Sequence, residues 1–318
     1  MWWTLSAARP KAMRPGNTLP HAGRGHGLAL VLGSGGVRSI AAIGIAGRLA
    51  REGIRPDLVA GCSSGALFGA QIAMGMEGDE ALRAATALWS PELTQQRRWR
   101  SYLQVIAPSL AGFGTGFAMR DDALIAQRVQ AAFGDARLES LPTPLRVAAT
   151  NAADGKPVVL TTGRVAHAVR ASMALPIIFP SVEIDGRRLV DGVISDPLPL
   201  AAAADARVVI TLGFAGAMPR RIDRLSRMVA QTSTTLINNL MDARIAVARA
   251  SGQRLISIDL QLDQHVGLWD TSAMPYLFDA GWQACERELP EIVAALEGAC
   301  VGPSPLSGAG AAQFALAI

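Results

Sequence analysis

Five residues in the first quarter of the chain, Gly61-Cys62-Ser63-Ser64-Gly65, fit the pattern G-x-S-x-G. In this pattern a serine stands on a sharp turn between a strand and a helix, where its hydroxyl is exposed as a nucleophile. The glycines two residues away on each side leave room for the strained turn. The pentapeptide alone is also compatible with a glycine-rich turn that has no chemical role, because the chain contains 32 glycines.

A serine nucleophile also needs hydrogen-bond donors that stabilise an oxyanion, and a glycine-rich loop upstream can supply them. The loop Gly33-Ser34-Gly35-Gly36-Val37-Arg38 follows an apolar run and opens a predicted helix. The backbone N–H groups of Gly35, Gly36 and Val37 can converge there, because glycine permits close approach. A nucleotide-binding loop is the alternative, but Arg38 stands where G-x-G-x-x-G requires a glycine, and no Gly-Lys-Ser/Thr follows.

The candidate base is Asp191, which follows the strand-like run Arg188-Leu189-Val190 and precedes Gly192. A carboxylate at the end of a strand, with a glycine behind it, can reach into a site at the edge of a sheet. Since a carboxyl of this type has a reference pKa of about 3.9, it is a weak base and depends on a desolvated site. The alternative for this pair alone is a turn-forming Asp-Gly.

Short apolar runs alternate with helical segments, which is typical of an α/β fold with a largely parallel sheet. A glycine- and proline-broken segment, 101–119, is either a cap over the site or a long packed loop. Strands are predicted at residues 27–32, 57–60, 144–151, 157–161, 182–184, 188–190, 208–212 and 254–260. Helices are predicted at residues 38–52, 66–74, 79–89, 121–133, 164–174, 221–250 and 274–298.

The composition of the 318 residues is that of a globular enzyme, and the net charge of +4 lies entirely in residues 1–27. The rest is therefore neutral, which argues against a nucleic-acid-binding protein. We expect a basic, flexible arm over 1–26, one hydrolase domain over 27–300 and a flexible tail over 301–318. The arm begins with two tryptophans and is either a solvated tail or a contact with an anionic membrane surface.

Two further features bear on the setting of the protein. The cysteines, Cys62, Cys285 and Cys300, are too few and too scattered for a disulfide framework or a zinc site. No apolar run reaches the length of a membrane span. From the cysteine usage we expect a reducing, cytoplasmic setting, and contact with the membrane periphery stays open. We expect no metal or cofactor, and the oligomeric state is not readable. Arginines 220, 221, 224 and 227 are expected on an exposed helix face.

Three separated segments together resemble the patatin-like phospholipases, a family of serine lipid acyl hydrolases. Residues 29–49 resemble the glycine-rich oxyanion segment of the family, and Gly61 to Gly65 match its serine turn. Residues 168–199 resemble the segment that contains its catalytic aspartate. The likeness covers roughly residues 27–215, in the order and spacing of the family.

The resemblance implies a three-layer α/β/α sandwich with a mostly parallel central sheet, and a Ser-Asp dyad without a histidine. Ser63 would attack the ester carbonyl of a lipid or other acyl ester, and Asp191 would accept its proton and later activate water. Arg38 would fix the glycine loop or meet an anionic head group. The oxyanion would be held by the N–H groups of Gly35, Gly36 and Val37, with Gly61, Gly65 and Gly192 in support.

Two other functions stay open at this stage. The order Ser63, Asp191, His265 also fits a hydrolase triad. A patatin fold that binds lipid or regulates without catalysis would be favoured by the departures Ser39 and Val193, which stand where the family usually has small residues; Cys62 is a third departure. The substrate is open among phospholipid, lysophospholipid, neutral glyceride and thioester.

Overall fold

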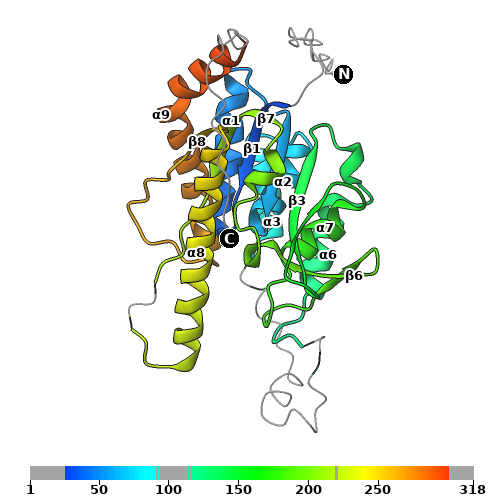
Figure 1. Cartoon of the computed structure of the whole chain (residues 1–318). Helices are drawn as coiled ribbons and strands as arrows, with labels where there is room; N and C mark the ends of the chain where they lie inside the picture. Colours follow the sequence, from blue (N-terminus) through cyan, green and yellow to red (C-terminus); the bar gives the residue numbers. More distant parts are fainter. Residues whose placement is uncertain (1–25, 91, 93–113, 115–116, 219–220, 301–318) are drawn as a thin grey trace, which may run out of the picture.

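The computed structural model describes residues 26–90, 92, 114, 117–218 and 221–300. At its centre is an eight-stranded sheet in the order β5-β6-β3-β2-β1-β7-β8, with β4 paired to β3 (Figure 1). The five strands from β3 to β8 in this order are parallel, and β4, β5 and β6 are antiparallel. The strands are β1 (His26–Leu32), β2 (Leu58–Cys62), β3 (Leu145–Asn151), β4 (Pro157–Leu160), β5 (Val182–Ile184), β6 (Arg187–Asp191), β7 (Ala206–Leu212) and β8 (Arg254–Ser257).

Strand β1 shows why the sheet is covered on both faces. Leu28, Leu30 and Leu32 face the larger hydrophobic cluster, whereas Ala29 and Val31 face a second cluster on the other side. An uninterrupted apolar run is the pattern of a parallel strand buried on both faces. The expected three-layer α/β/α sandwich with a mostly parallel sheet is therefore confirmed.

The larger helical layer contains a close contact between two helices, α1 and α9, which lie side by side (Figure 1). A Cβ atom on Gly44 would lie 2.1 Å from the carbonyl oxygen of Phe278, and one on Gly281 would lie 2.1 Å from that of Ala41. Both positions therefore require glycine. The helices of this layer are α1 (Ala41–Arg51), α2 (Ser64–Ala73), α3 (Gly78–Leu88), α6 (Ala123–Phe133), α7 (Val165–Ser172) and α9 (Met274–Cys300).

The opposite face is covered by α8 (Leu225–Ala250) and by the short 3-10 helix η5 (Leu200–Ala203). Only the second half of α8 packs closely, because its buried residues are Met241 and Ala248. Arg244 anchors this half through an ion pair with the buried Asp196, at 3.1 Å.

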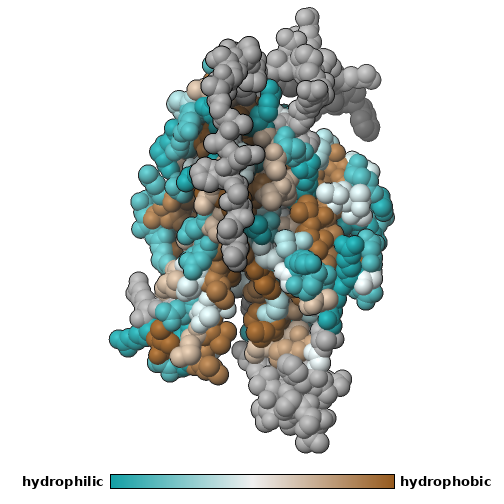
Figure 2. Space-filling view, viewed as in Figure 1, coloured by the Kyte–Doolittle hydropathy of each residue, from teal (hydrophilic) through white to brown (hydrophobic). Residues whose placement is uncertain are grey.

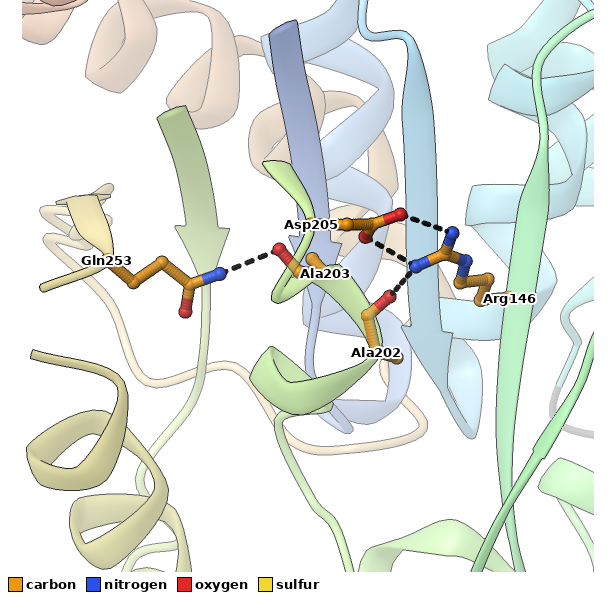
Figure 3. A network of polar contacts seen from close by, with 5 residues as sticks. All are labelled: Arg146, Ala202, Ala203, Asp205 and Gln253. Atoms are coloured by element: carbon orange, nitrogen blue, oxygen red, sulfur yellow. Dashed lines mark hydrogen bonds and ion pairs between the residues drawn. The ribbon is translucent and has the colours of Figure 1, made fainter. Parts of the chain in front are cut away.

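Hydrogen bonds fix the stretch around η5 to the sheet (Figure 3). Arg146 on β3 donates to the carbonyl oxygen of Ala202 at 2.6 Å and to both carboxylate oxygens of Asp205 at 2.6 and 2.8 Å. Gln253 donates through Nε2 to the carbonyl oxygen of Ala203 at 2.7 Å. The segment that leads from Asp191, the candidate base, to β7 is therefore fixed at the end next to β7.

Several boundaries differ from the expected ones. The helix expected over 38–52 starts as the 3-10 helix η1 (Gly36–Ile40) before α1 begins. Arg221 and Arg224 precede α8 and do not lie on a helix face, although both are exposed as expected. The expected hairpin between β3 and β4 is confirmed. The expectations for the arm up to residue 25, for the tail and for most of segment 101–119 fall outside the described residues.

The carboxyl ends of the parallel strands meet at one end of the molecule, the lower end in Figure 1. The glycine loop follows β1 there, and the serine turn follows β2. In open α/β sheets this is the end at which ligands bind. We refer to it below as the catalytic end.

Candidate active site

Ser63 stands on a strained turn between β2 and α2, with φ 56° and ψ −123°. Residues with a Cβ rarely adopt such angles, and they are held there only by tight surroundings. A Cβ on Gly61 would lie 2.6 Å from the Cα of Ala66, and one on Gly65 would lie 2.4 Å from the carbonyl oxygen of Leu32. The two glycines of the G-x-S-x-G pattern are therefore required by space.

The structure brings Ser63 and Asp191 together. The Ser63 hydroxyl donates to Oδ2 of Asp191 at 2.8 Å, and the backbone N–H of Val193 donates to Oδ1 at 2.9 Å. Asp191 is the last residue of β6 and is 2% exposed. The thiol of Cys62 is a weak third donor, 4.0 Å from Oδ1. Among the described residues, Ser63 is therefore the one donor to Oδ2.

The burial of Asp191 changes its acidity. Removal from water raises the pKa of this carboxyl from 3.8 to about 7, although the Val193 N–H and the Ser63 hydroxyl stabilise the carboxylate and lower it. A general base works best when its pKa lies near the working pH. Asp191 is therefore a much stronger base than an exposed aspartate.

The backbone of Asp191 is fixed on both sides. Its N–H donates to the carbonyl oxygen of Ala174 at 2.9 Å, and its carbonyl oxygen accepts from the Thr150 hydroxyl at 2.8 Å. Gly192 has no room for a side chain, because a Cβ there would lie 2.6 Å from the carbonyl oxygen of Ala148. The carboxylate therefore has little freedom to move.

The bulk of Val193 is accommodated beside the dyad. Its side chain is buried in a small apolar cluster with Cys62 and Ala148, against which Ile237 of α8 packs. Burial also raises the pKa of the Cys62 thiol, which keeps it neutral next to the carboxylate. Val193 and Cys62, two departures from the family pattern, thus form the apolar surroundings that keep Asp191 out of water.

Sequence reasoning missed Ser172, which positions the turn. The hydroxyl of Ser172, on α7, accepts a hydrogen bond from the Ser63 N–H at 2.7 Å and donates to the carbonyl oxygen of Ala148 at 2.6 Å. The only available signal was its place within the segment 168–199.

A chain of hydroxyls ties the glycine loop to the serine turn. The Gly35 N–H donates to Oγ of Ser64 at 3.1 Å, and Ser64 Oγ lies 2.9 Å from Ser39 Oγ. Ser39 in turn donates to the carbonyl oxygen of Gly33 at 3.3 Å. All three bonds are satisfied when Ser64 donates to Ser39, and both serines are buried. Ser39, which also departs from the family pattern, therefore has a hydrogen-bond partner, Ser64, that sequence alone did not reveal.

The expected oxyanion donors are only partly available. The N–H of Gly35 is engaged by Ser64, and that of Val37 donates to the carbonyl oxygen of Leu268 at 2.9 Å. Within the described residues no acceptor is found for the N–H of Gly36 or for that of Ser64, which opens α2. Of the three N–H groups expected to hold the oxyanion, that of Gly36 is therefore without an acceptor here, as is that of Ser64.

The side chain of Arg38 contacts the glycine loop and the ring of Phe214. Its Nε donates to the carbonyl oxygen of Gly35 at 3.3 Å, and its guanidinium lies 4.9 Å from the ring centre of Phe214. Partial burial lowers the pKa of the guanidinium. Of the two roles expected for Arg38, these contacts correspond to fixing the loop.

The structure does not assemble the alternative triad. His265 is exposed on the segment between β8 and α9, and Ser63 contacts Asp191 directly, with no ring between them. The residues described here also contain no group of His, Cys, Asp or Glu side chains that could hold a metal ion. None of the helices in the described ranges combines the length and apolarity that a bilayer crossing requires.

Comparison with known proteins places the chain in a family. The model of the patatin-like phospholipase family matches residues 30–204, more than half of the chain. The chain belongs to the patatin-like phospholipase family. The match includes the glycine loop, the serine turn and the aspartate segment of this family member.

Relatives of this patatin-like chain occur in bacteria and mammals. An uncharacterized NTE family protein of Mycobacterium tuberculosis is 35% identical over 217 residues, which cover 65% of this chain and 56% of that protein. Patatin-like phospholipase domain-containing protein 7 of Rattus norvegicus is 32% identical over 193 residues, 59% of this chain and 14% of that protein. The chain thus spans little more than half the length of the mycobacterial relative. The crystal structure of VipD from Legionella pneumophila matches with a TM-score of 0.43 and 15% identity, over 85% of this chain and 67% of that one.

The raised pKa of Asp191 predicts a stability effect with a definite sign. Because the folded state favours the protonated carboxyl, wild-type stability falls as pH rises from about 4 to about 7. A shift of this size corresponds to a loss on the order of 4 kcal/mol. We expect Asp191→Asn to melt several degrees above wild type at pH 8, with a difference that shrinks towards pH 4 in calorimetry.

The matched control is Asp263→Asn, which also removes one carboxylate, from an exposed position. It should show no such pH-dependent gain in melting temperature. An Asp191→Asn variant that melts below wild type at pH 8 would contradict the inference that the ionised, desolvated carboxylate of Asp191 destabilises the fold.

Proposed function

We propose that this protein hydrolyses carboxylic esters of lipids, with Ser63 as nucleophile and Asp191 as general base. The observation that supports this most directly is the 2.8 Å hydrogen bond from the serine hydroxyl to a buried carboxylate whose pKa is raised to about 7. The family supports the class of substrate, because its name and that of the rat relative refer to phospholipases.

The first half of the reaction forms an acyl-enzyme. Ser63 Oγ attacks the ester carbonyl carbon while its proton passes to Asp191. The carbonyl oxygen becomes an oxyanion, which the N–H groups of Gly36 and Ser64 stabilise. When the tetrahedral intermediate collapses, the C–O bond to the alcohol breaks, and Asp191 returns the proton to the leaving oxygen.

The second half regenerates the enzyme. A water molecule attacks the acyl carbon as Asp191 accepts its proton, and a second oxyanion forms at the same donors. Collapse breaks the bond to Ser63 Oγ, which takes the proton back, and a fatty acid leaves. Asp191 therefore acts as base and acid in turn, which suits a group with a pKa near neutrality.

The hydroxyl chain sets the position of the donors in this proposal. Oxyanion donors act only when they are held in place before the charge develops, and losing one costs roughly 3–4 kcal/mol of transition-state stabilisation. Through Ser39 and Ser64, the glycine loop is held against the turn that contains the nucleophile. The departure at Ser39 therefore supports the catalytic proposal instead of a non-catalytic one.

Hydrolysis of a short p-nitrophenyl ester tests the assignment of the dyad. We expect Ser63→Ala to abolish hydrolysis and Asp191→Asn to lower kcat by a factor on the order of a thousand, the scale of a lost general base. His265→Ala should keep wild-type rates. An Asp191→Asn variant with full activity, combined with an inactive His265→Ala, would favour the triad. A wild-type rate equal to that of Ser63→Ala would favour a protein that binds lipid without catalysis.

Ser39→Ala tests the hydroxyl chain. Loss of the Ser39 hydroxyl leaves the Ser64 hydroxyl without an acceptor and loosens the glycine loop. We therefore expect kcat to fall roughly tenfold while KM stays constant. This fall is smaller than that expected for the loss of an oxyanion donor. The control is Ser257→Ala, which removes another internal hydroxyl, from β8. It should lower the melting temperature slightly without changing kcat. Equal kcat in all three proteins would show that the hydroxyl chain has no role in positioning.

A further inference from the structure

The first half of α8 and the residues just before it present apolar side chains to solvent. Leu225 is 76% exposed and Leu236 is 64% exposed, although both are leucines on a helix. They lie with Val229 on one face, because positions four and eleven residues apart fall on one side of a helix. The exposed apolar residues here are Met218, Ile222, Leu225, Met228, Val229 and Leu236, which we call the α8 apolar surface.

Packing among the described residues does not account for this surface. Helix α8 buries only Met241 and Ala248, both in its second half. The first half projects beyond the sheet at the catalytic end (Figure 1), and hydrophobic residues gather over it at the lower left of Figure 2. Contiguous exposed apolar patches of this kind mark interaction sites.

The charges beside the α8 apolar surface are mostly positive. Arg221, Arg224 and Arg227 are all exposed, and within the part of the chain that the structure describes only Arg227 pairs with an acid, Asp223 at 2.8 Å. Asp223 is the sole acid in the sequence between residues 213 and 241. Apolar side chains flanked by arginines are typical of segments that lie on an anionic lipid surface.

The position of this surface relative to the dyad adds an independent observation. Ile237 of α8 packs against the cluster of Cys62 and Val193 that borders Asp191. Ile194, three residues after Asp191, and Ile177, three residues after Ala174, are also about half exposed. Ile177 is held at a φ of 72°, which β-branched residues rarely adopt. Exposed apolar side chains thus also occur in the segments that lead to and follow Asp191.

We propose that the α8 apolar surface docks the catalytic end on an anionic lipid bilayer. A second copy of the chain fits the surface less well, because a two-fold interface would bring the same arginines together. The inference rests on the proposed function only in the purpose of docking, which is to present acyl esters in the bilayer to Ser63. The docking itself depends on the apolar residues and arginines alone.

Vesicle flotation of the full chain tests the proposal, with phosphatidylcholine vesicles that contain or lack phosphatidylserine. We expect wild type to float with the anionic vesicles, and less so at high salt. Leu225→Asp combined with Leu236→Asp should reduce this binding at least tenfold. Arg221→Gln combined with Arg224→Gln should reduce it roughly thirtyfold on anionic vesicles only, as expected for two lost surface charges.

The matched controls lie at the other end of the same helix. Val247→Asp introduces a charge at a residue that is 62% exposed, and Arg249→Gln removes an exposed arginine. Both should bind vesicles like wild type. All variants should keep wild-type melting temperatures and rates on a monomeric short ester, because none of these residues touches the dyad.

Three results would overturn the proposal. The first is a wild-type protein that does not float with anionic vesicles, and the second is equal loss of binding in Val247→Asp. The third is a dimer that Leu225→Asp with Leu236→Asp dissociates, without vesicle binding. Flotation and ester hydrolysis measured together on wild type separate the two proposals. A wild type that floats but hydrolyses no ester would refute the hydrolase and leave the docking surface intact.

Discussion

The site depends on one constraint: a carboxylate is kept out of water without a positive partner. Among the described residues, the donors to Asp191 are the Ser63 hydroxyl, the Val193 N–H and, at 4.0 Å, the weakly donating Cys62 thiol, and burial raises its pKa to about 7. An arginine or lysine in contact would stabilise the charged form and return the carboxyl to a weak base. In the proposed mechanism the apolar cluster around Val193 and Cys62 therefore matters for the chemistry as well as for packing.

The surrounding fold meets this constraint by fixing the two partners from different layers. Ser63 is held by the strained turn after β2, by glycines that leave no room for side chains, and by the hydroxyl of Ser172 from α7. Asp191 is held from β3 through Thr150 and from the end of α7 through Ala174. Because each group is fixed separately, the short hydrogen bond between them needs no third side chain.

The part of the site that follows local rules could be predicted from sequence. Gly61 and Gly65 mark the turn because their steric role depends on residues nearby, and Asp191 was found by its strand-end position and the family likeness. Contacts between distant segments could not be found this way. Spacing does not reveal that Leu268 engages the Val37 N–H, or that Ser39 meets Ser64. The fold class was predictable for a similar reason, since the alternation of apolar runs and helices is local.

The most direct test of the account is the pH dependence of Ser63 phosphonylation by a fluorophosphonate. Reaction requires the serine proton to pass to an ionised Asp191, so the rate constant should rise with pH through a midpoint near 7. Asp191→Asn should react slowly and show no such midpoint, whereas His265→Ala should follow wild type. A midpoint near 4, or one that persists in Asp191→Asn, would contradict the buried aspartate as the base.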